Sequence, residues 1–200
     1  MPIRTLMLAT ANAHKVIEMK SLLADCGWNV IAAPAEITDV EETGETFAAN
    51  ARLKAQTVAA AAGAIALADD SGLMVDALDG APGLHSKRWA GDGATDAERI
   101  AKLLSAMEGV PTDRRDGRFV CAVCIAAPGG ALWEGAGSVE GTIALSPRGE
   151  GGFGYDPVFL FADGRSMAEL TESEKNMVSH RGRAMRAASQ WLLEHLNDAI

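Results

Sequence analysis

The sequence predicts a mixed α/β fold in which helices flank a central sheet. Strand-like and helix-like segments alternate through the first 70 residues, a pattern typical of α/β proteins. Two longer strand-like segments, 118–127 and 131–145, follow one another across a Pro-Gly-Gly turn and predict a hairpin. The chain has 200 residues, of which 48% are hydrophobic, so we expect a single domain over 1–200 with a full core.

Four helices are expected from apolar residues that recur every three or four positions. Gly27 ends the first helix, and the pair Thr95 and Glu98 forms a capping box before the third. A further capping box, Thr171 with Glu174, precedes the last helix. The helices and their apolar stripes are 13–25 (Val16, Met19 or Lys20, Leu23), 45–62 (Phe47, Ala51, Ala55, Val58, Ala62), the segment after Thr95 (Ile100, Leu103, Leu104, Met107) and 182–196 (Met185, Ala188, Leu192, Leu196).

Three short strands are expected in the first half of the chain, at 3–9, 28–32 and 64–68, from apolar runs bounded by turn residues. The third run leads directly into Asp69, Asp70, Ser71 and Gly72. Because these residues are ordinary turn formers, we expect the strand to end before them. The two acids then belong either to a solvated turn or to a functional site.

The composition narrows the possible functions. Acidic residues outnumber basic ones 27 to 18 and no Lys/Arg-rich run occurs, which argues against a surface that coats nucleic acid or a membrane. A small anion needs only a few local donors, and an acidic protein often binds one through a metal. No apolar run approaches the roughly 20 residues of a membrane-spanning helix, and the N-terminus lacks the basic region of a secretory signal.

The three cysteines are expected to be packing residues. They are Cys26, Cys121 and Cys124, and an odd number fits a reducing, cytoplasmic location. Cys121 and Cys124 have metal-like spacing, but strand alternation places them on opposite faces of the 118–127 strand. No second pair is present to complete a metal site.

Polar segments near two of the early elements are candidates for anion and metal binding. The turn "TANAHK" joins a strand to a helix and offers backbone N–H groups with Thr10, Asn12 and Lys15, although it also suits a plain turn capped by Asn12. The acidic loop "DVEETGE" contains Asp39, Glu41, Glu42 and Glu45, and such acids are favourable before a helix in their own right. Together with "ADDSG", this loop offers carboxylates from separate segments, as a Mg²⁺ site needs.

Two later segments suggest a binding site for a base and its phosphates. The segment "RGEGGFGYDP" carries four glycines between positions 149 and 154 beside Phe153 and Tyr155. Glycines allow close backbone approach to a ligand, and an aromatic ring offers a stacking face. Lys175, His180 and Arg181 lie near the start of the last helix, where they are expected to face an anion or a carbonyl.

Five segments in order carry a resemblance to a known family. They are "ATANAHK", "EETGETFAANARLKA", "ADDSGLMVDALDGAPGLHSKRWAG", "GGFGYDPVF" and "LTESEKNMVSHRGRA", and they span the chain from about residue 4 to the last helix. They resemble the inosine triphosphate pyrophosphatase family, the Ham1-like enzymes that act on dITP and XTP. One departure is visible, because the family usually has glycine where this chain has Ala11.

The resemblance implies an elongated mixed α/β fold with two lobes around a deep nucleotide cleft, and a homodimer. It also implies Mg²⁺-dependent hydrolysis of ITP, dITP or XTP to the monophosphate and pyrophosphate, with Asp70 as the proton acceptor. The implied metal ligands are Glu41 and Asp70. The implied substrate contacts are Thr10, Ala11, Asn12, Ala13, His14, Lys15, Lys54, Ser71, Phe153, Gly154, Tyr155, Asp156, Lys175, His180 and Arg181.

A donor–acceptor argument connects Arg181 to base selection. Hypoxanthine and xanthine carry a carbonyl where adenine carries an amino group, and a guanidinium can only donate. Adenine therefore leaves donors facing donors, at about 1–3 kcal/mol for each unpaired buried group.

Three alternatives are open on the sequence. A related pyrophosphatase for pyrimidine or modified nucleotides would prefer a different base. A nucleotide-binding regulator would bind without releasing pyrophosphate. A Mg²⁺ phosphatase with an aspartate nucleophile would release orthophosphate.

Overall fold

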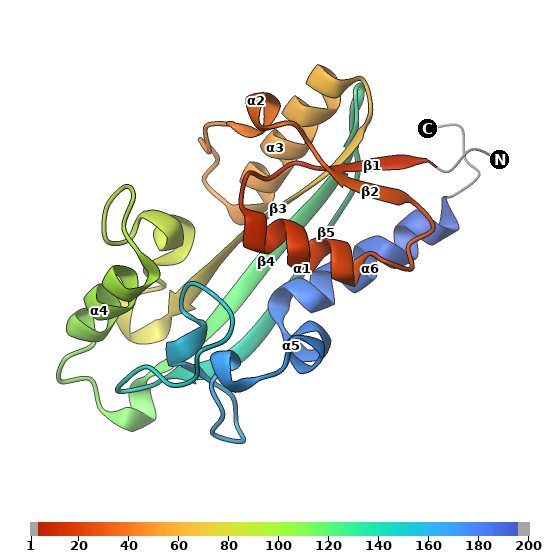
Figure 1. Ribbon diagram of the computed structural model, residues 1–200. Helices are drawn as coiled ribbons and strands as arrows, with labels where there is room; N and C mark the ends of the chain where they lie inside the picture. Colours follow the sequence, from red (N-terminus) through yellow and green to blue (C-terminus); the bar gives the residue numbers. More distant parts are fainter. Residues whose placement is uncertain (1–3, 196–200) are drawn as a thin grey trace. The chain divides into compact units, whose positions relative to one another are not determined.

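The computed structural model describes residues 4–195 (Figure 1). Helices and strands alternate through the first third of the chain, and the longest strands follow one another in its second half. The strands are β1 Thr5–Leu8, β2 Asn29–Ala32, β3 Ile65–Val75, β4 Asp116–Ala127, β5 Gly130–Ile143 and β6 Phe159–Leu160. The α-helices are α1 Ala13–Leu22, α2 Ala35–Thr38, α3 Phe47–Ala62, α4 Asp96–Ala106, α5 Glu172–Val178 and α6 His180–Glu194. Short 3₁₀ turns lie at Asp76–Leu78, Gly83–Arg88, Thr112–Arg114, Asp156–Val158 and Met167–Glu169.

The strands form one mixed sheet in the order β2-β1-β3-β4-β5-β6. The strand β1 is parallel to both β2 and β3, whereas β6 is antiparallel to β5. Only positions 128 and 129 separate the neighbouring strands β4 and β5, so the two form an antiparallel hairpin. The predicted α/β class and the predicted hairpin are therefore confirmed.

The chain divides into two compact units. Unit 1 contains the residues up to Asp70, Cys121–Gly137 and the residues from Arg181 onward, and unit 2 contains Ser71–Val120 and Ser138–His180. The single domain and the cleft expected from the sequence stay predictions.

In unit 1, apolar residues pack on both faces of the sheet. On one face, α1 and α6 contribute Met19, Leu23, Met185 and Leu192 to a cluster with Leu6, Leu67 and Cys121. On the other face, the alanine-rich stripe of α3 packs against Ala66, Ala68 and Cys124. Cys121 and Cys124 thus lie in different clusters and both are buried, as predicted, and all three cysteines are free.

In unit 2, the core forms between β3, α4 and β5. Leu73 and Val75 pack with Leu103 and Met107, and Phe159 lies in the same cluster. The capping box of Thr95 and Glu98 begins α4, and that of Thr171 and Glu174 begins α5, both as predicted.

The limits of several elements differ from the predictions. The helix α3 begins at Phe47, after Thr46, whose hydroxyl accepts from the amide of Ala49, and α6 begins two residues before the predicted position 182. The predicted first residue of β1, Ile3, and the predicted last apolar contact of α6, Leu196, lie outside the described residues. No helix among residues 4–195 is long and apolar enough to cross a membrane.

The prediction that the third strand ends before Asp69 is wrong. The strand β3 has 11 residues and continues through Asp69, Asp70, Ser71 and Gly72. Both acids are buried, with exposed fractions of 1% and 7%. A buried strand tolerates charges only where partners neutralise them, and such partners are present here.

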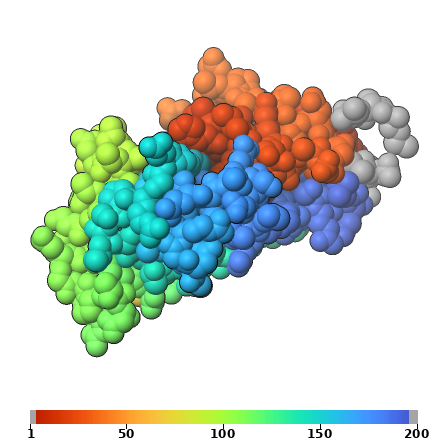
Figure 2. Space-filling model, turned by 60° about the horizontal axis from the view of Figure 1, so that its bottom comes forward, coloured from red at the N-terminus to blue at the C-terminus, as the bar shows by residue number. Residues whose placement is uncertain are grey.

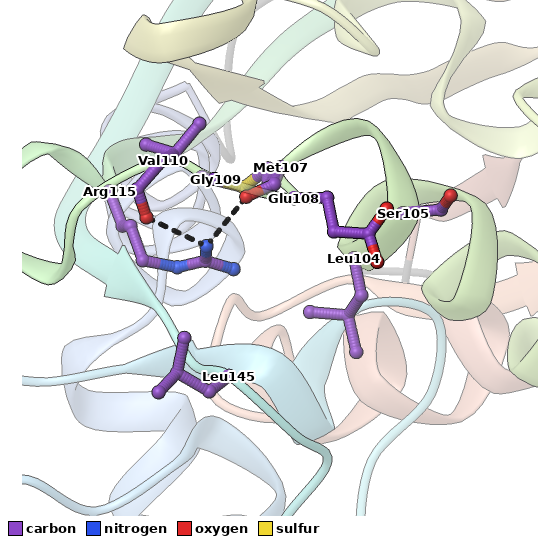
Figure 3. Close-up of a pocket in the computed structure, with 8 residues that line it drawn as sticks. All are labelled: Leu104, Ser105, Met107, Glu108, Gly109, Val110, Arg115 and Leu145. Carbon is purple, nitrogen blue, oxygen red and sulfur yellow. Dashed lines mark hydrogen bonds between the residues drawn. The ribbon is translucent and has the colours of Figure 1, made fainter.

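In unit 2, a buried arginine donates hydrogen bonds to main-chain carbonyls at the C-terminal end of α4. The Arg115 guanidinium is 3% exposed and donates to four main-chain carbonyls, those of Met107, Val110, Ile143 and Ala144. Figure 3 shows two of these bonds, and the same side chain lines a surface cavity of about 380 Å³. None of the predicted site residues lines this cavity.

Arg115→Met should destabilise the chain, because it removes the guanidinium that donates to four main-chain carbonyls at the end of α4 and at the end of β5. We expect the free energy of unfolding to fall by about 3 kcal/mol. Urea denaturation measures it, and Arg114→Met on the exposed neighbouring residue is the matched control. Equal stability of the two variants contradicts this role of Arg115.

Candidate functional site

Two consecutive carboxylates on β3, those of Asp69 and Asp70, have different surroundings. Side chains alternate along a strand, so consecutive residues point to opposite faces of the sheet. Asp69 lies 3.7 Å from the Cys121 thiol, on the face covered by α1 and α6. Asp70 contacts α3 on the other face. The functional difference between the two acids follows from these neighbours.

Asp69 belongs to a buried network of charges. One of its carboxylate oxygens accepts from the Lys15 ammonium at 3.0 Å, and the other accepts from Nε and Nη2 of Arg181, each at 3.2 Å. The remaining arm of the Arg181 guanidinium, Nη1, donates to Glu18 at 2.5 Å. Arg181 is 2% exposed, so its positive charge is neutralised by protein carboxylates rather than by solvent.

The network keeps Asp69 ionised. Burial alone favours the uncharged carboxyl, but Lys15 and Arg181, with a contribution from Lys54, outweigh it and hold the pKa of Asp69 well below its usual range. A carboxylate of this kind is a poor proton acceptor. Its role is that of a fixed counter-ion.

Asp70 is held by two residues of α3 that lie one helical turn apart. Oδ2 of Asp70 accepts from the Asn50 side-chain amide at 3.1 Å, and Oδ1 lies 3.5 Å from the Lys54 ammonium. Lys54 also donates to Glu42 at 2.6 Å. Asn50 and Lys54 are four positions apart in the sequence, which places them on one stripe of the helix.

Asp70 is the better proton acceptor of the pair. Burial raises the pKa of Asp70 above its usual value, and the negative charge of Glu42 adds to the rise, while Lys54 and the Asn50 hydrogen bond oppose it. Neighbouring carboxylates whose pKa values are driven apart are typical of acid–base sites. The structure therefore distinguishes a structural Asp69 from a chemically active candidate, Asp70.

The turn from Thr10 to Lys15 serves as the cap of α1. The Thr10 hydroxyl accepts from the amide of Asn12, and the Asn12 side chain accepts from the amide of Lys15, both at 3.2 Å. Among residues 4–195, Asp79 is the one non-glycine residue with positive φ, so alanine at position 11 brings no backbone strain. Ala11, Ala13 and His14 are exposed. Lys15 extends from this turn to Asp69.

A second cluster of predicted site residues lies in unit 2. The buried carboxylate of Asp156 accepts from the amide of Phe153 at 2.9 Å and from the Lys175 ammonium at 2.7 Å. The same ammonium lies 4.7 Å from the centre of the Phe153 ring. Phe153, Asp156 and Lys175 are thus brought together as the sequence suggested, and Phe153 is half-buried.

The glycines of this segment, which is exposed over positions 149–152 (cyan in Figure 2), serve the chain's own packing. A Cβ at Gly152, where φ is +72°, would lie 2.1 Å from the Asp156 carboxylate. At Gly149 it would lie 2.6 Å from the backbone of Ala168. At these two positions the chain's own packing requires glycine, and close approach of this segment to a ligand stays a prediction.

Tyr155 and His180 are core residues of unit 2. The Tyr155 side chain is 4% exposed and its hydroxyl donates to the carbonyl of Ser86 at 2.9 Å, so the ring is not available as a stacking face. The His180 ring stacks on Phe119, with 4.7 Å between the ring centres. Ser71 follows Asp70 on β3 and is partly exposed.

The residues around Asp70 suit a hard divalent cation. The charge networks of Asp69 and Asp70 contain the carboxylates Glu18, Glu42, Asp69 and Asp70 and the cations Lys15, Lys54 and Arg181. No group of three or more His, Cys, Asp or Glu side chains among residues 4–195 forms a complete metal site. Mg²⁺ binds to one or two carboxylates and takes its other ligands from phosphates and water, so the donor set fits.

Three residues that contact the predicted site residues had no role assigned from the sequence. Glu42, rather than the exposed Glu41, is bonded to Lys54, Asn50 holds Asp70, and Glu18 holds Arg181. The four-residue spacing of Asn50 and Lys54 was a signal in the sequence for the role of Asn50. Glu18 follows Lys15 by three positions, which places both on one face of α1.

Fold and site together are those of an α/β protein in which one strand carries two buried carboxylates bonded to lysines and an arginine. A protein-family model described as the Ham1 family matches residues 6–191, and the chain belongs to this family.

Relatives of known name support this placement. The dITP/XTP pyrophosphatase of Symbiobacterium thermophilum is 46% identical over 182 residues, which make up 91% of each chain. That of Desulforamulus reducens is 49% identical over 190 residues, 94% of each chain. Among solved structures, a HAM1 protein from Coxiella burnetii is 43% identical with a TM-score of 0.88, and the match covers 96% of this chain and 100% of that one.

Arg181→Met should destabilise the protein strongly, because the buried carboxylates of Asp69 and Glu18 then lose their bonds to its guanidinium. We expect a loss of about 3–5 kcal/mol in the free energy of unfolding. Chemical denaturation followed by circular dichroism measures it, with Arg183→Met on the exposed face of α6 as the control. If the variant keeps its stability but loses its preference among bases, the predicted structural role of Arg181 is wrong, and the base-selecting role inferred from the sequence is supported instead.

Proposed function

We propose that this chain hydrolyses the triphosphates of non-standard purine nucleosides, ITP, dITP and XTP, to the monophosphate and pyrophosphate. The relatives named dITP/XTP pyrophosphatase support this, because the first three are 46–51% identical to the chain and cover more than nine-tenths of it. The single structural observation that supports it best is the contrast on β3 between a neutralised Asp69 and an Asp70 with a raised pKa.

The proposed chemistry is attack by water on the first phosphorus of the triphosphate. The phosphates repel a nucleophile by their charge, so positioning and charge neutralisation are most of what a protein can supply. Lys15 and Lys54 supply positive charge in unit 1. Burial lowers the pKa of Lys54, but the negative charges of Asp70, Asp69 and Glu42 outweigh this effect and raise the pKa, so Lys54 stays charged. Both lysines are proposed phosphate contacts, together with the turn Thr10–Lys15.

Asp70 is the proposed proton acceptor for the attacking water. The Asn50 amide fixes one of its oxygens at 3.1 Å, which orients the carboxylate. A raised pKa makes the carboxylate a stronger base. The proton goes from water to Asp70, the new bond joins the water oxygen to the first phosphorus, and pyrophosphate leaves.

Mg²⁺ is the proposed cofactor. When bound, it neutralises charge on the phosphate oxygens and helps to align them. Asp70 with Glu41, as inferred from the sequence, or with Glu42, which contacts Lys54, would hold it.

The residues of unit 2 are the proposed contacts of the nucleoside. The half-buried Phe153 ring, with Lys175 and Asp156 beside it, offers an apolar face bordered by a donor and an acceptor. Ser71, Gly154, Tyr155 and His180 join them on the strength of the family resemblance, and Arg181 is the proposed selector of a carbonyl on the base. A homodimer, a cytoplasmic location and one domain over residues 1–200 are further proposals that rest on the family resemblance and the composition.

Asp70→Asn should abolish turnover and leave nucleotide binding largely intact, because the amide keeps the shape of the side chain but accepts no proton. We expect kcat for ITP to fall at least about 100-fold while Kd changes less than about threefold. Pyrophosphate release and isothermal titration with ITP measure the two quantities.

Asp92→Asn, an exposed acid-to-amide change, is the control and should match the wild type. Near-normal kcat in Asp70→Asn would show that another group takes the proton.

Product analysis separates the proposed activity from the alternatives. With Mg²⁺ present we expect pyrophosphate and the monophosphate from ITP and XTP, at rates at least about tenfold above those for ATP and GTP. EDTA should stop turnover, and excess Mg²⁺ should restore it.

The other outcomes are equally specific. Orthophosphate as the first product indicates a phosphatase, and faster cleavage of dUTP than of dITP indicates a pyrimidine enzyme. ITP binding without any product indicates a regulator.

A further inference from the structure

The backbone of the glycine-rich loop is held by carboxylates at two successive peptide groups. The amide of Phe153 donates to Asp156 Oδ2 at 2.9 Å, and the amide of Gly154 donates to Asp96 Oδ2 at 2.7 Å. These two peptide groups flank the Cα of Phe153. Fixing both restricts φ and ψ of Phe153, and therefore the direction in which its ring projects.

Asp96 is itself held in place. It is the first residue of α4, where a negative charge is favourable near the helix N-terminus. Its other carboxylate oxygen, Oδ1, accepts from Arg99, and Arg99 also donates to the carbonyls of Ala94 and Lys87. The acceptor for Gly154 therefore has a fixed position, although 42% of the Asp96 side chain is exposed.

The other carboxylate, Asp156, is fixed as well. It is 3% exposed and bound by the Lys175 ammonium, which also lies over the Phe153 ring. Gly154 has a φ of +64°, a conformation that a glycine adopts without strain. The segment 152–156 is thus held from two sides, by α5 through Lys175 and by α4 through Asp96.

We propose that Asp96 is a positioning residue for base selection: it holds the Gly154 peptide and, through it, the ring of Phe153. The inference rests on the proposed function, in which Phe153 contacts the purine base. Asp96 bonds to Arg99 and to the Gly154 amide, and not to the lysines proposed to contact the phosphates, so its expected effect is on binding and selectivity rather than on the chemical step.

Asp96→Ala tests this, because it removes the acceptor and leaves the glycine loop intact in sequence. We expect KM for ITP to rise about five- to tenfold with kcat within about twofold, since the loss is one of binding. The ratio of kcat/KM for ITP to that for ATP should fall about fivefold, because a mobile Phe153 discriminates less between bases. Hydrogen–deuterium exchange of the Gly154 amide should become about tenfold faster.

Two matched variants separate the loop contact from the ion pair with Arg99. Asp96→Asn keeps a side-chain oxygen that accepts from Gly154 and should restore KM and selectivity to within about twofold of the wild type. Arg99→Gln removes the ion pair and leaves the Asp96 carboxylate next to the Gly154 amide, so its loss of base selectivity should be smaller than that of Asp96→Ala. Thermal unfolding of each variant confirms that the fold is kept.

Each outcome decides the inference. Wild-type values of KM, selectivity and exchange in Asp96→Ala overturn it, as does an equal loss of selectivity in Arg99→Gln. A wild-type chain that releases no pyrophosphate from ITP overturns the proposed function instead, and the exchange rate of Gly154 then tests the contact with Asp96 independently.

Discussion

The bonds of Lys15 and Arg181 to Asp69 are the interaction on which the site in unit 1 depends. A charged residue inside a buried strand costs several kcal/mol unless its charge is matched. Here the match comes from α1 and α6, which also cover that face of the sheet. Because Asp69 is neutralised, β3 continues without a break, and Asp70 is presented on a regular strand rather than on a loop. The position of the proposed proton acceptor is thus set by its neighbour.

Most local features of the fold could be predicted from the sequence, because they depend on residues a few positions apart. The capping boxes at Thr95 and Thr171, the hairpin at positions 128 and 129 and the shared stripe of Asn50 and Lys54 are of this kind. The continuation of β3 could not be predicted in this way. Its cause lies in Lys15 and Arg181, 54 and 112 positions away from Asp69, and turn propensity gave the opposite answer.

The candidate site shows the same limit. Residue types and order, together with the family resemblance, were enough to single out Asp70, Lys54, Phe153, Asp156 and Lys175, which the structure brings into two clusters. They were not enough to separate Glu42 from Glu41, since adjacent acids in a loop have no periodicity to distinguish them. Nor did they show that Tyr155 is a core residue, because an aromatic ring suits a stacking face and a core equally well.

The buried arginines Arg115 and Arg181 have different partners and therefore different effects on the structure. Arg115 donates only to main-chain carbonyls, which carry no net charge, so its effect is to join α4 to β5 in unit 2. Arg181 donates to two carboxylates and so fixes the ionisation of Asp69. If carbonyls alone surrounded Arg181, Asp69 would have to be neutralised by Lys15, and less positive charge would remain for a phosphate. The pairing of Arg181 with Glu18 and Asp69 therefore leaves Lys15, 16% exposed, as the partner of Asp69 that solvent and an anionic ligand can reach.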